Sequence, residues 1–218
     1  MIWRIIICLL AGYGFGCIST GYIVGMRQHV DIRKCGSGNV GTTNALRTLG
    51  KKAALITLLG DVIKCVIPVL LIKYVVFPEY SYTELLGLYT ALGVVLGHNF
   101  PFYLHFKGGK GIAVLVGTIL TFDWRIFVIC VLSFVVVVLI TRYVSVGSLL
   151  MEVEFVLFVA VTRQGDWHML CLSAVFALLA FYTHRENIKR LFAGTENKIG
   201  KKAPIPEQEN EKEEKQNG

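Results

Sequence analysis

The sequence predicts an all-α integral membrane protein, a polytopic bundle of about seven transmembrane helices. Apolar residues make up 54% of its 218 residues and charged residues only 17%, and the mean hydropathy is +0.59. Soluble domains carry about 25% charged residues, so this composition argues against a soluble, disordered or coiled-coil chain. At about 20 residues per crossing, the length allows roughly five to seven spans with short loops.

The candidate crossings are seven apolar runs, at 4–26, 53–77, 82–103, 111–122, 126–140, 145–162 and 168–183. The first three are long enough to span a bilayer, whereas the fourth is short and is expected to be partly re-entrant. Five crossings are the alternative count. Both counts are odd, so the two chain ends should lie on opposite faces. Arg4 is the only basic residue at the start of the first run, which favours a retained helix over a cleaved signal peptide.

The distribution of basic residues predicts the orientation. Of the 22 Lys and Arg residues, 17 fall in loops on one face and three on the other, and Lys64 and Lys73 lie inside a run. Because cytoplasmic loops are enriched in Lys and Arg, we expect the N-terminus outside and the C-terminus in the cytoplasm. The net charge of +7 suits anionic lipid heads or phosphorylated substrates better than nucleic acid.

Residues 1–200 are expected to form a single transmembrane domain. Residues 201–218 are polar and charged, which predicts a disordered cytoplasmic tail. The six cysteines are scattered and show no Cys/His spacing typical of zinc, so we expect no bound metal.

Three polar segments then fall on the predicted cytoplasmic face. The first, residues 31–50, combines glycines with small polar side chains and one arginine: Gly36, Ser37, Gly38, Asn39, Thr43, Asn44 and Arg47. Glycines allow backbone amides to turn inward and form an anion nest, and a helix beginning near Thr42 or Thr43 would strengthen it. Arg47 could make two hydrogen bonds to a phosphate. The alternative is a flexible turn with helix caps.

The second segment, residues 97–114, contains Lys107, Gly108, Gly109 and Lys110 before a predicted helix. It lacks the Walker A spacing, yet amides and ammonium groups here could still face a phosphate. The alternative is a pair of lysines snorkelling to lipid heads. His98, at a helix end, is a candidate base or phosphate donor, or a histidine bonded only to a carbonyl.

The third segment, residues 183–200, follows the last run. A cytoplasmic anchor explains its lysines and arginines but explains His184, Asn187 and Glu196 less well. A histidine at the interface is a plausible acid, base or phosphate contact. Ser145, in the string RYVSVGS, is expected at the same rim.

Ionisable residues inside apolar runs are costly in lipid and therefore carry a function or tie helices together. Asp61 and Lys64 are three residues apart on one helical face and can pair. Glu152 and Glu154 lie in the sixth run. No GxSxG nucleophile elbow is present in the sequence.

The strings GSGNVGTTNALRTLG, GDVIK, GHNFPFYLHFKGGKGIA, RYVSVGS and HRENIKRLFAGTENKIG resemble the bacterial PlsY family, the acyl-phosphate:glycerol-3-phosphate acyltransferases. The blocks follow the family order from about residue 15 to residue 200. Cys65 and Val114 depart from the family pattern, which has glycine and threonine there.

The resemblance implies a seven-helix enzyme of the bacterial cell membrane with its motifs on the cytoplasmic face and no cofactor. Such an enzyme moves a fatty acyl group from acyl phosphate to the sn-1 hydroxyl of glycerol 3-phosphate. The products are lysophosphatidic acid and phosphate, in the first acylation step of phospholipid biosynthesis. The expected partners are therefore acyl phosphate, glycerol 3-phosphate and membrane lipids.

The residue patterns and the resemblance together suggest roles. Ser37, His184 and Lys110 are the catalytic candidates, and His184 or the substrate phosphate would serve as the base. The phosphate-binding candidates are Gly36, Gly38, Asn39, Thr43, Asn44, Arg47, Lys107, Gly108, Gly109 and Asn187. His98, Ser145 and Glu196 are candidate supporting residues. The rival functions are a phosphate or organophosphate transporter and a non-catalytic lipid-binding scaffold.

Overall fold

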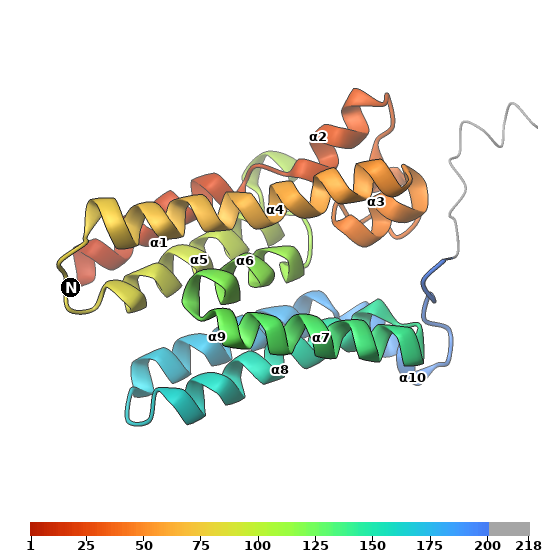
Figure 1. The fold of residues 1–218 in the computed structure, drawn as a ribbon. Coiled ribbons are helices and arrows are strands. Elements are labelled where there is room, and N and C mark those ends of the chain that lie inside the picture. The colour runs from red at the N-terminus through yellow and green to blue at the C-terminus, as the bar shows by residue number, and fades with distance from the viewer. Residues whose placement is uncertain (201–218) are drawn as a thin grey trace, which may run out of the picture.

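The fold is a bundle of helices, seen in a computed structural model that describes residues 1–200 (Figure 1). No strand occurs within that range. The expected tail, 201–218, lies outside the described residues. The helices are α1 (Ile2–Gly16), α2 (Thr20–Arg27), α3 (Thr42–Thr48), α4 (Lys51–Leu71), α5 (Thr83–Asn99), α6 (Ile112–Phe122), α7 (Trp124–Thr141), α8 (Val144–Thr162), α9 (Trp167–Thr183) and α10 (Arg185–Phe192), with 3-10 turns at Ile32–Lys34 and Phe102–Leu104 and a π-helical turn at Ile72–Val76.

Each of the seven predicted apolar runs is helical, which confirms the all-α membrane class. Within residues 1–200, five segments are long and apolar enough to cross a membrane, and a sixth qualifies if α9 and α10, bent by 60°, count as one. Helix α6 has 11 residues. At 1.5 Å per residue it reaches about half of the 30 Å hydrocarbon core, so a seventh crossing through α6 stays a prediction.

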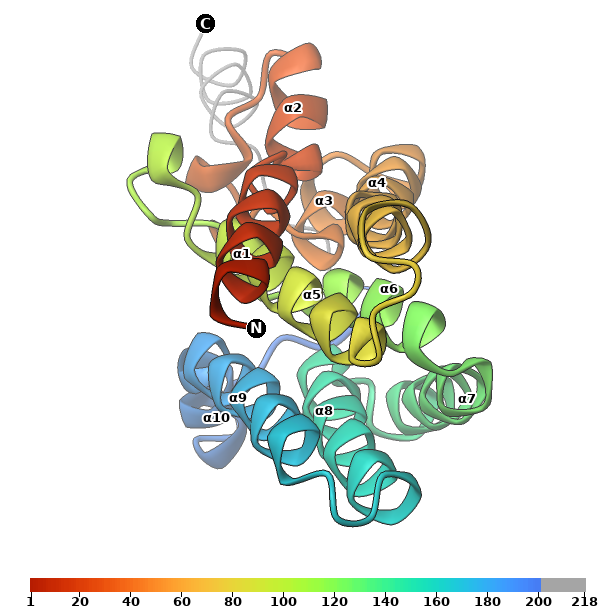
Figure 2. The same cartoon turned by 90° about the vertical axis from the view of Figure 1, so that its left-hand side faces the viewer.

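The helices form two groups, α1–α6 and α7–α10, which lie side by side (Figures 1 and 2). In the first group α1 packs closely on α5 because glycines line the contact. A Cβ atom at Gly12 would lie 2.1 Å from the carbonyl oxygen of Thr90, and one at Gly97 would lie 2.2 Å from that of Tyr13. Small residues of this kind let two membrane helices approach backbone to backbone.

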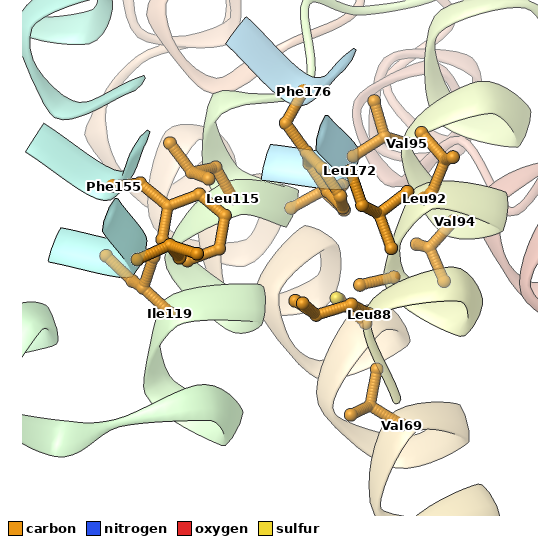
Figure 3. Close-up of a cluster of buried hydrophobic side chains, with 14 of the residues drawn as sticks. Val69, Leu88, Leu92, Val94, Val95, Leu115, Ile119, Phe155, Leu172 and Phe176 are labelled. Carbon is orange, nitrogen blue, oxygen red and sulfur yellow. The ribbon is translucent and has the colours of Figure 1, made fainter. Parts of the chain in front are cut away.

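One apolar core joins the two groups (Figure 3). Leu115 and Ile119 of α6 meet Phe155 of α8 and Phe176 of α9, and all four side chains are buried. The Phe155 and Phe176 rings pack edge to face with centroids 6.0 Å apart, a favoured aromatic geometry. This core holds the groups together, so that the polar loops of the first lie against α8 and α10 of the second.

Three of the ionisable residues inside the runs have side-chain partners. Asp61 and Lys64 form the predicted ion pair, with 2.8 Å between the carboxylate and ammonium groups. Glu154 accepts a 2.7 Å hydrogen bond from Ser133, which links α8 to α7.

Candidate active site

A cavity of about 390 Å³ lies between the two helix groups. Its walls come from the loop before α3, from the starts of α6 and α8, and from parts of α4, α7 and α10. Eleven of the sixteen predicted site residues line this cavity: Ser37, Asn39, Thr43, Asn44, Arg47, His98, Lys110, Ser145, His184, Asn187 and Glu196. Three segments far apart in the sequence therefore converge on one site, which agrees with their predicted location on the same face of the membrane.

Asn44 organises the first loop. It is 2% exposed, and its Oδ1 accepts a 3.0 Å hydrogen bond from the Ser37 amide. Its Nδ2 donates to the carbonyl oxygens of Ile32, Cys35 and Asn39 at 3.2, 3.0 and 2.8 Å. Because these bonds use the whole side-chain amide, Asn44 shapes the loop that presents Ser37, rather than serving mainly as a phosphate ligand.

The glycines of this loop serve its turns. Gly36 and Gly38 have φ values of 59° and 70°, a left-handed conformation that glycine adopts without strain. The Gly38 amide donates to the Cys35 carbonyl oxygen at 2.9 Å. Gly36 and Gly38 are not among the residues lining the cavity. The anion nest expected in this loop therefore has fewer free backbone amides than predicted. The Ser37 amide already donates to Asn44 and the Gly38 amide to Cys35.

Thr42 lines the cavity although it is not one of the sixteen predicted site residues. It begins α3, and its hydroxyl oxygen is buried and has no hydrogen-bond partner within residues 1–200. A buried hydroxyl facing a cavity without a partner is an open position for a ligand oxygen.

The second loop folds back on the end of α5. The amides of Gly108 and Gly109 donate to the carbonyl oxygens of Asn99 and His98, both at 3.0 Å. Neither glycine lines the cavity. The two amides were expected to face a phosphate, but in the structure they donate to backbone carbonyl oxygens instead. Gly109 is needed for another reason, because a Cβ atom there would lie 2.0 Å from His98 Nε2.

The two lysines of this loop separate. Lys107 is exposed and is not among the cavity-lining residues, so the structure gives it no place in the site. Lys110 lines the cavity, and its ammonium group donates to the Oδ1 of Asn187 in α10. Burial lowers the pKa of Lys110 to about 8, with Glu196 opposing the shift and Arg190 and Arg47 adding to it.

Glu196 connects the residues of the third segment. Its carboxylate accepts hydrogen bonds from Ser145 at 3.1 Å, from Asn187 at 2.7 Å and from Arg190 at 2.8 Å. Burial alone would raise the pKa of Glu196, but the hydrogen bonds from Asn187 and Arg190 outweigh it and lower the pKa below its usual value. This anionic carboxylate holds Asn187, which in turn holds Lys110.

Arg190 was missed by the sequence analysis. It lies three residues after Asn187, which lies three residues after His184, and all three line the cavity. This i, i+3, i+6 spacing on one helical face was the available signal. Arg47 and Arg190 together with Lys110 make the mouth of the cavity cationic.

His184 follows the last residue of α9 and precedes α10. Its Nδ1 donates to the Ala180 carbonyl oxygen at 2.9 Å, because a carbonyl oxygen can only accept. Burial, and after it the Lys110 cation, lowers the pKa of His184 to about 4. At neutral pH the ring is therefore uncharged and its Nε2 carries a lone pair, so His184 can accept a proton or a hydroxyl hydrogen bond.

The remaining wall of the cavity is apolar. Leu58, Val116, Val131, Phe134 and Met151 line it, from α4, α6, α7 and α8. A cationic mouth joined to an apolar arm between membrane helices fits an amphiphile with an anionic head and a hydrocarbon tail.

Comparison with known proteins decides the family. A profile described as glycerol-3-phosphate acyltransferase matches residues 6–194. The chain belongs to the glycerol-3-phosphate acyltransferase family. Relatives of that name from Thermoanaerobacter sp. (strain X514) and Clostridioides difficile (strain 630) are 41% and 43% identical, and each match covers 92% of this chain and 98% of the relative.

Solved structures agree. The fold matches PlsY, an integral membrane glycerol 3-phosphate acyltransferase, in its glycerol 3-phosphate form, with a TM-score of 0.79 and 34% identity over 91% of this chain and 95% of the other. The lysophosphatidic acid form matches with the same TM-score and 33% identity. Members of the glycerol-3-phosphate acyltransferase family are enzymes, and this chain is a multi-pass membrane acyltransferase.

Proposed function

We propose that this acyltransferase moves a fatty acyl group from acyl phosphate to the sn-1 hydroxyl of glycerol 3-phosphate. The products are lysophosphatidic acid and inorganic phosphate. The observation that carries the proposal is the cavity, which joins a cationic mouth containing Arg47, Lys110 and Arg190 to an apolar arm. Both proposed substrates carry phosphate, and one also carries a hydrocarbon tail, so a single cavity of this kind suits both.

In the proposed reaction the sn-1 oxygen attacks the acyl carbonyl carbon, and the bond from that carbon to the phosphate oxygen breaks. The hydroxyl proton passes to His184 Nε2 or to a phosphate oxygen of the substrate. Lys110 and Arg47 neutralise the charge that develops on the departing phosphate. Acyl phosphate already has a good leaving group, so positioning and electrostatic stabilisation supply the main rate enhancement.

Ser37 binds substrate in this scheme and forms no acyl-enzyme. Its amide is held by Asn44, and in residues 1–200 no hydrogen bond joins its hydroxyl to His184 or His98. A serine nucleophile needs such an activating base. We therefore assign the Ser37 hydroxyl to a hydrogen bond with a phosphate oxygen.

We further propose that the cavity faces the cytoplasm of a bacterial cell. The excess of basic residues in the loops that build its mouth supports this orientation. Ser37→Cys can be labelled with a membrane-impermeant maleimide in a Cys171→Ala background, since the other cysteines are buried. Labelling only after permeabilisation is expected. Glu79→Cys, in the exposed turn at the other end of α4, is the matched control that should be labelled in intact cells.

The transferase proposal is tested with purified protein, palmitoyl phosphate and glycerol 3-phosphate. We expect lysophosphatidic acid and phosphate to form in equal amounts, with little product when palmitoyl-CoA or palmitoyl acyl carrier protein replaces palmitoyl phosphate. Efficient transfer from either thioester without turnover of palmitoyl phosphate would refute the proposed donor. The donors can be compared in one preparation, so inactive protein is recognised by a lack of turnover with all three.

A further inference from the structure

The buried ion pair of α4 lies beside the cavity but has no role in the reaction described so far. Asp61 and Lys64 are 1% and 4% exposed, and His98, which they contact, is 4% exposed. Asp61 and His98 both line the cavity. Burying an ammonium group and a carboxylate within a membrane protein is costly, which makes such groups candidates for a functional role.

The Lys64 ammonium group has three polar neighbours. It donates to the Ile18 carbonyl oxygen at 2.7 Å, lies 2.8 Å from His98 Nδ1 within hydrogen-bond geometry, and forms an ion pair with Asp61 Oδ1 at 2.8 Å. A protonated lysine can only donate. In the hydrogen bond between Lys64 and His98, Nδ1 is therefore the acceptor.

A neutral imidazole whose Nδ1 accepts must carry its hydrogen on Nε2. Within residues 1–200, Nε2 of His98 has no hydrogen-bond partner, and it lies so close to Gly109 that a Cβ atom there would be only 2.0 Å away. His98 therefore presents an N–H donor. His184 has the opposite arrangement, because its Nδ1 donates to Ala180 and its Nε2 is left as the acceptor.

We propose that Lys64, held by Asp61 and Ile18, is a positioning residue that sets the tautomer of His98 so that Nε2–H donates to an oxygen of the bound substrate. The inference rests on the proposed function and deepens it. The two histidines then have opposite roles. His98 donates a hydrogen bond to an oxygen that gains charge as the acyl group is transferred, and His184 accepts a hydrogen bond from the attacking hydroxyl. A donor aimed at developing charge is a large catalytic contribution.

The tautomer is measured directly by nitrogen-15 NMR of the protein labelled at histidine, with the His98 signals assigned from a His98→Gln variant. We expect the Nδ1 of His98 to give the signal of an unprotonated nitrogen and Nε2 that of a protonated one. In Lys64→Met the two signals should exchange, because Asp61 Oδ1, 3.8 Å from Nδ1, becomes the acceptor for an Nδ1–H. A protonated Nδ1 in the unmodified protein would overturn the proposal. The NMR measurement needs no catalytic turnover, so its result can be distinguished from a failure of the proposed reaction.

Catalysis is tested with a double-mutant cycle. Removing Lys64 alone leaves a buried carboxylate unpaired and destabilises the fold, so the test variant is Asp61→Asn/Lys64→Met. We expect it to lower kcat by at least about tenfold but by less than about twofold in a His98→Gln background, where the glutamine supplies its own N–H donor. Equal losses in both backgrounds would assign the pair a structural role only.

The matched control is Lys73→Met, which also removes a buried lysine of the same helical segment. Lys73 donates to the Thr121 carbonyl oxygen at 3.0 Å, away from the cavity-lining residues. It should lower thermal stability without changing kcat or the His98 tautomer. Lys64→Arg, which keeps a cationic donor, should restore the unprotonated Nδ1 signal. A changed tautomer in Lys73→Met would contradict a specific role for Lys64.

Discussion

Lys110 should impose a pH dependence on glycerol 3-phosphate use. Its pKa is lowered to about 8, chiefly by burial. The cation is the form that binds phosphate, and it is lost as the pH rises through 8. A group of pKa about 8 is about 90% protonated at pH 7 and about 10% protonated at pH 9. We therefore expect kcat/KM for glycerol 3-phosphate to fall about tenfold between these values, since kcat/KM reports the free enzyme.

The other titratable groups of the proposed reaction, His184 and the substrate phosphate, should not change charge between pH 7 and pH 9, where Lys110 titrates. The pKa of His184 is about 4, so His184 stays neutral above pH 6, and a phosphate monoester has its second pKa near 6 and is a dianion above pH 7. The assay varies glycerol 3-phosphate at a fixed acyl phosphate concentration below its KM, so that free enzyme predominates, from about pH 6.5 to about 9.5, which brackets the pKa of Lys110. Lys110→Arg is the control, because arginine stays charged throughout. Its kcat/KM should be lower but flat. A flat wild-type profile, or an equal fall in Lys110→Arg, would refute the assignment.

Three further predictions concern single substitutions. Glu196→Ala should lower kcat/KM about 10-fold to 100-fold and Glu196→Gln less, because each hydrogen bond to a charged group contributes about 1.5–3 kcal/mol; steady-state kinetics with a thermal-shift measurement separates this from unfolding. Gly109→Ala should destabilise the protein by about 1–3 kcal/mol and lower activity, whereas Gly14→Ala, with nothing within 4 Å of the new methyl group, should do neither. Lys110→Ala should lower kcat/KM at least about tenfold and Lys107→Ala by less than about threefold; the reverse order would contradict the placement of the two lysines.

Most of the fold was predictable because the bilayer narrows the choices. An apolar run in lipid must satisfy its backbone hydrogen bonds internally, so each run became a helix. The Asp61–Lys64 pair was predictable from its i, i+3 spacing, and the structure confirms it at 2.8 Å. The break between α1 and α2, at Cys17–Ser19, was not visible within a continuous apolar run.

The site was predicted as a set of segments but not as a set of contacts. A glycine-rich loop has the same composition whether its amides face a ligand or its own carbonyl groups, so the internal bonds of Gly108 and Gly109 could not be read from sequence. The bond from Asn39 to the Gly108 carbonyl oxygen joins residues 69 positions apart, and only tertiary packing reveals it. Lys64 as a partner of His98 was missed for the same reason.

The most direct test of the central claim is an initial-velocity study in which palmitoyl phosphate and glycerol 3-phosphate are both varied. One cavity holding both substrates, with direct attack and no acyl-enzyme, predicts a sequential mechanism, seen as intersecting lines in double-reciprocal plots. Parallel lines would show that phosphate leaves before glycerol 3-phosphate binds. Together with an acyl group trapped covalently on Ser37, that result would contradict the account.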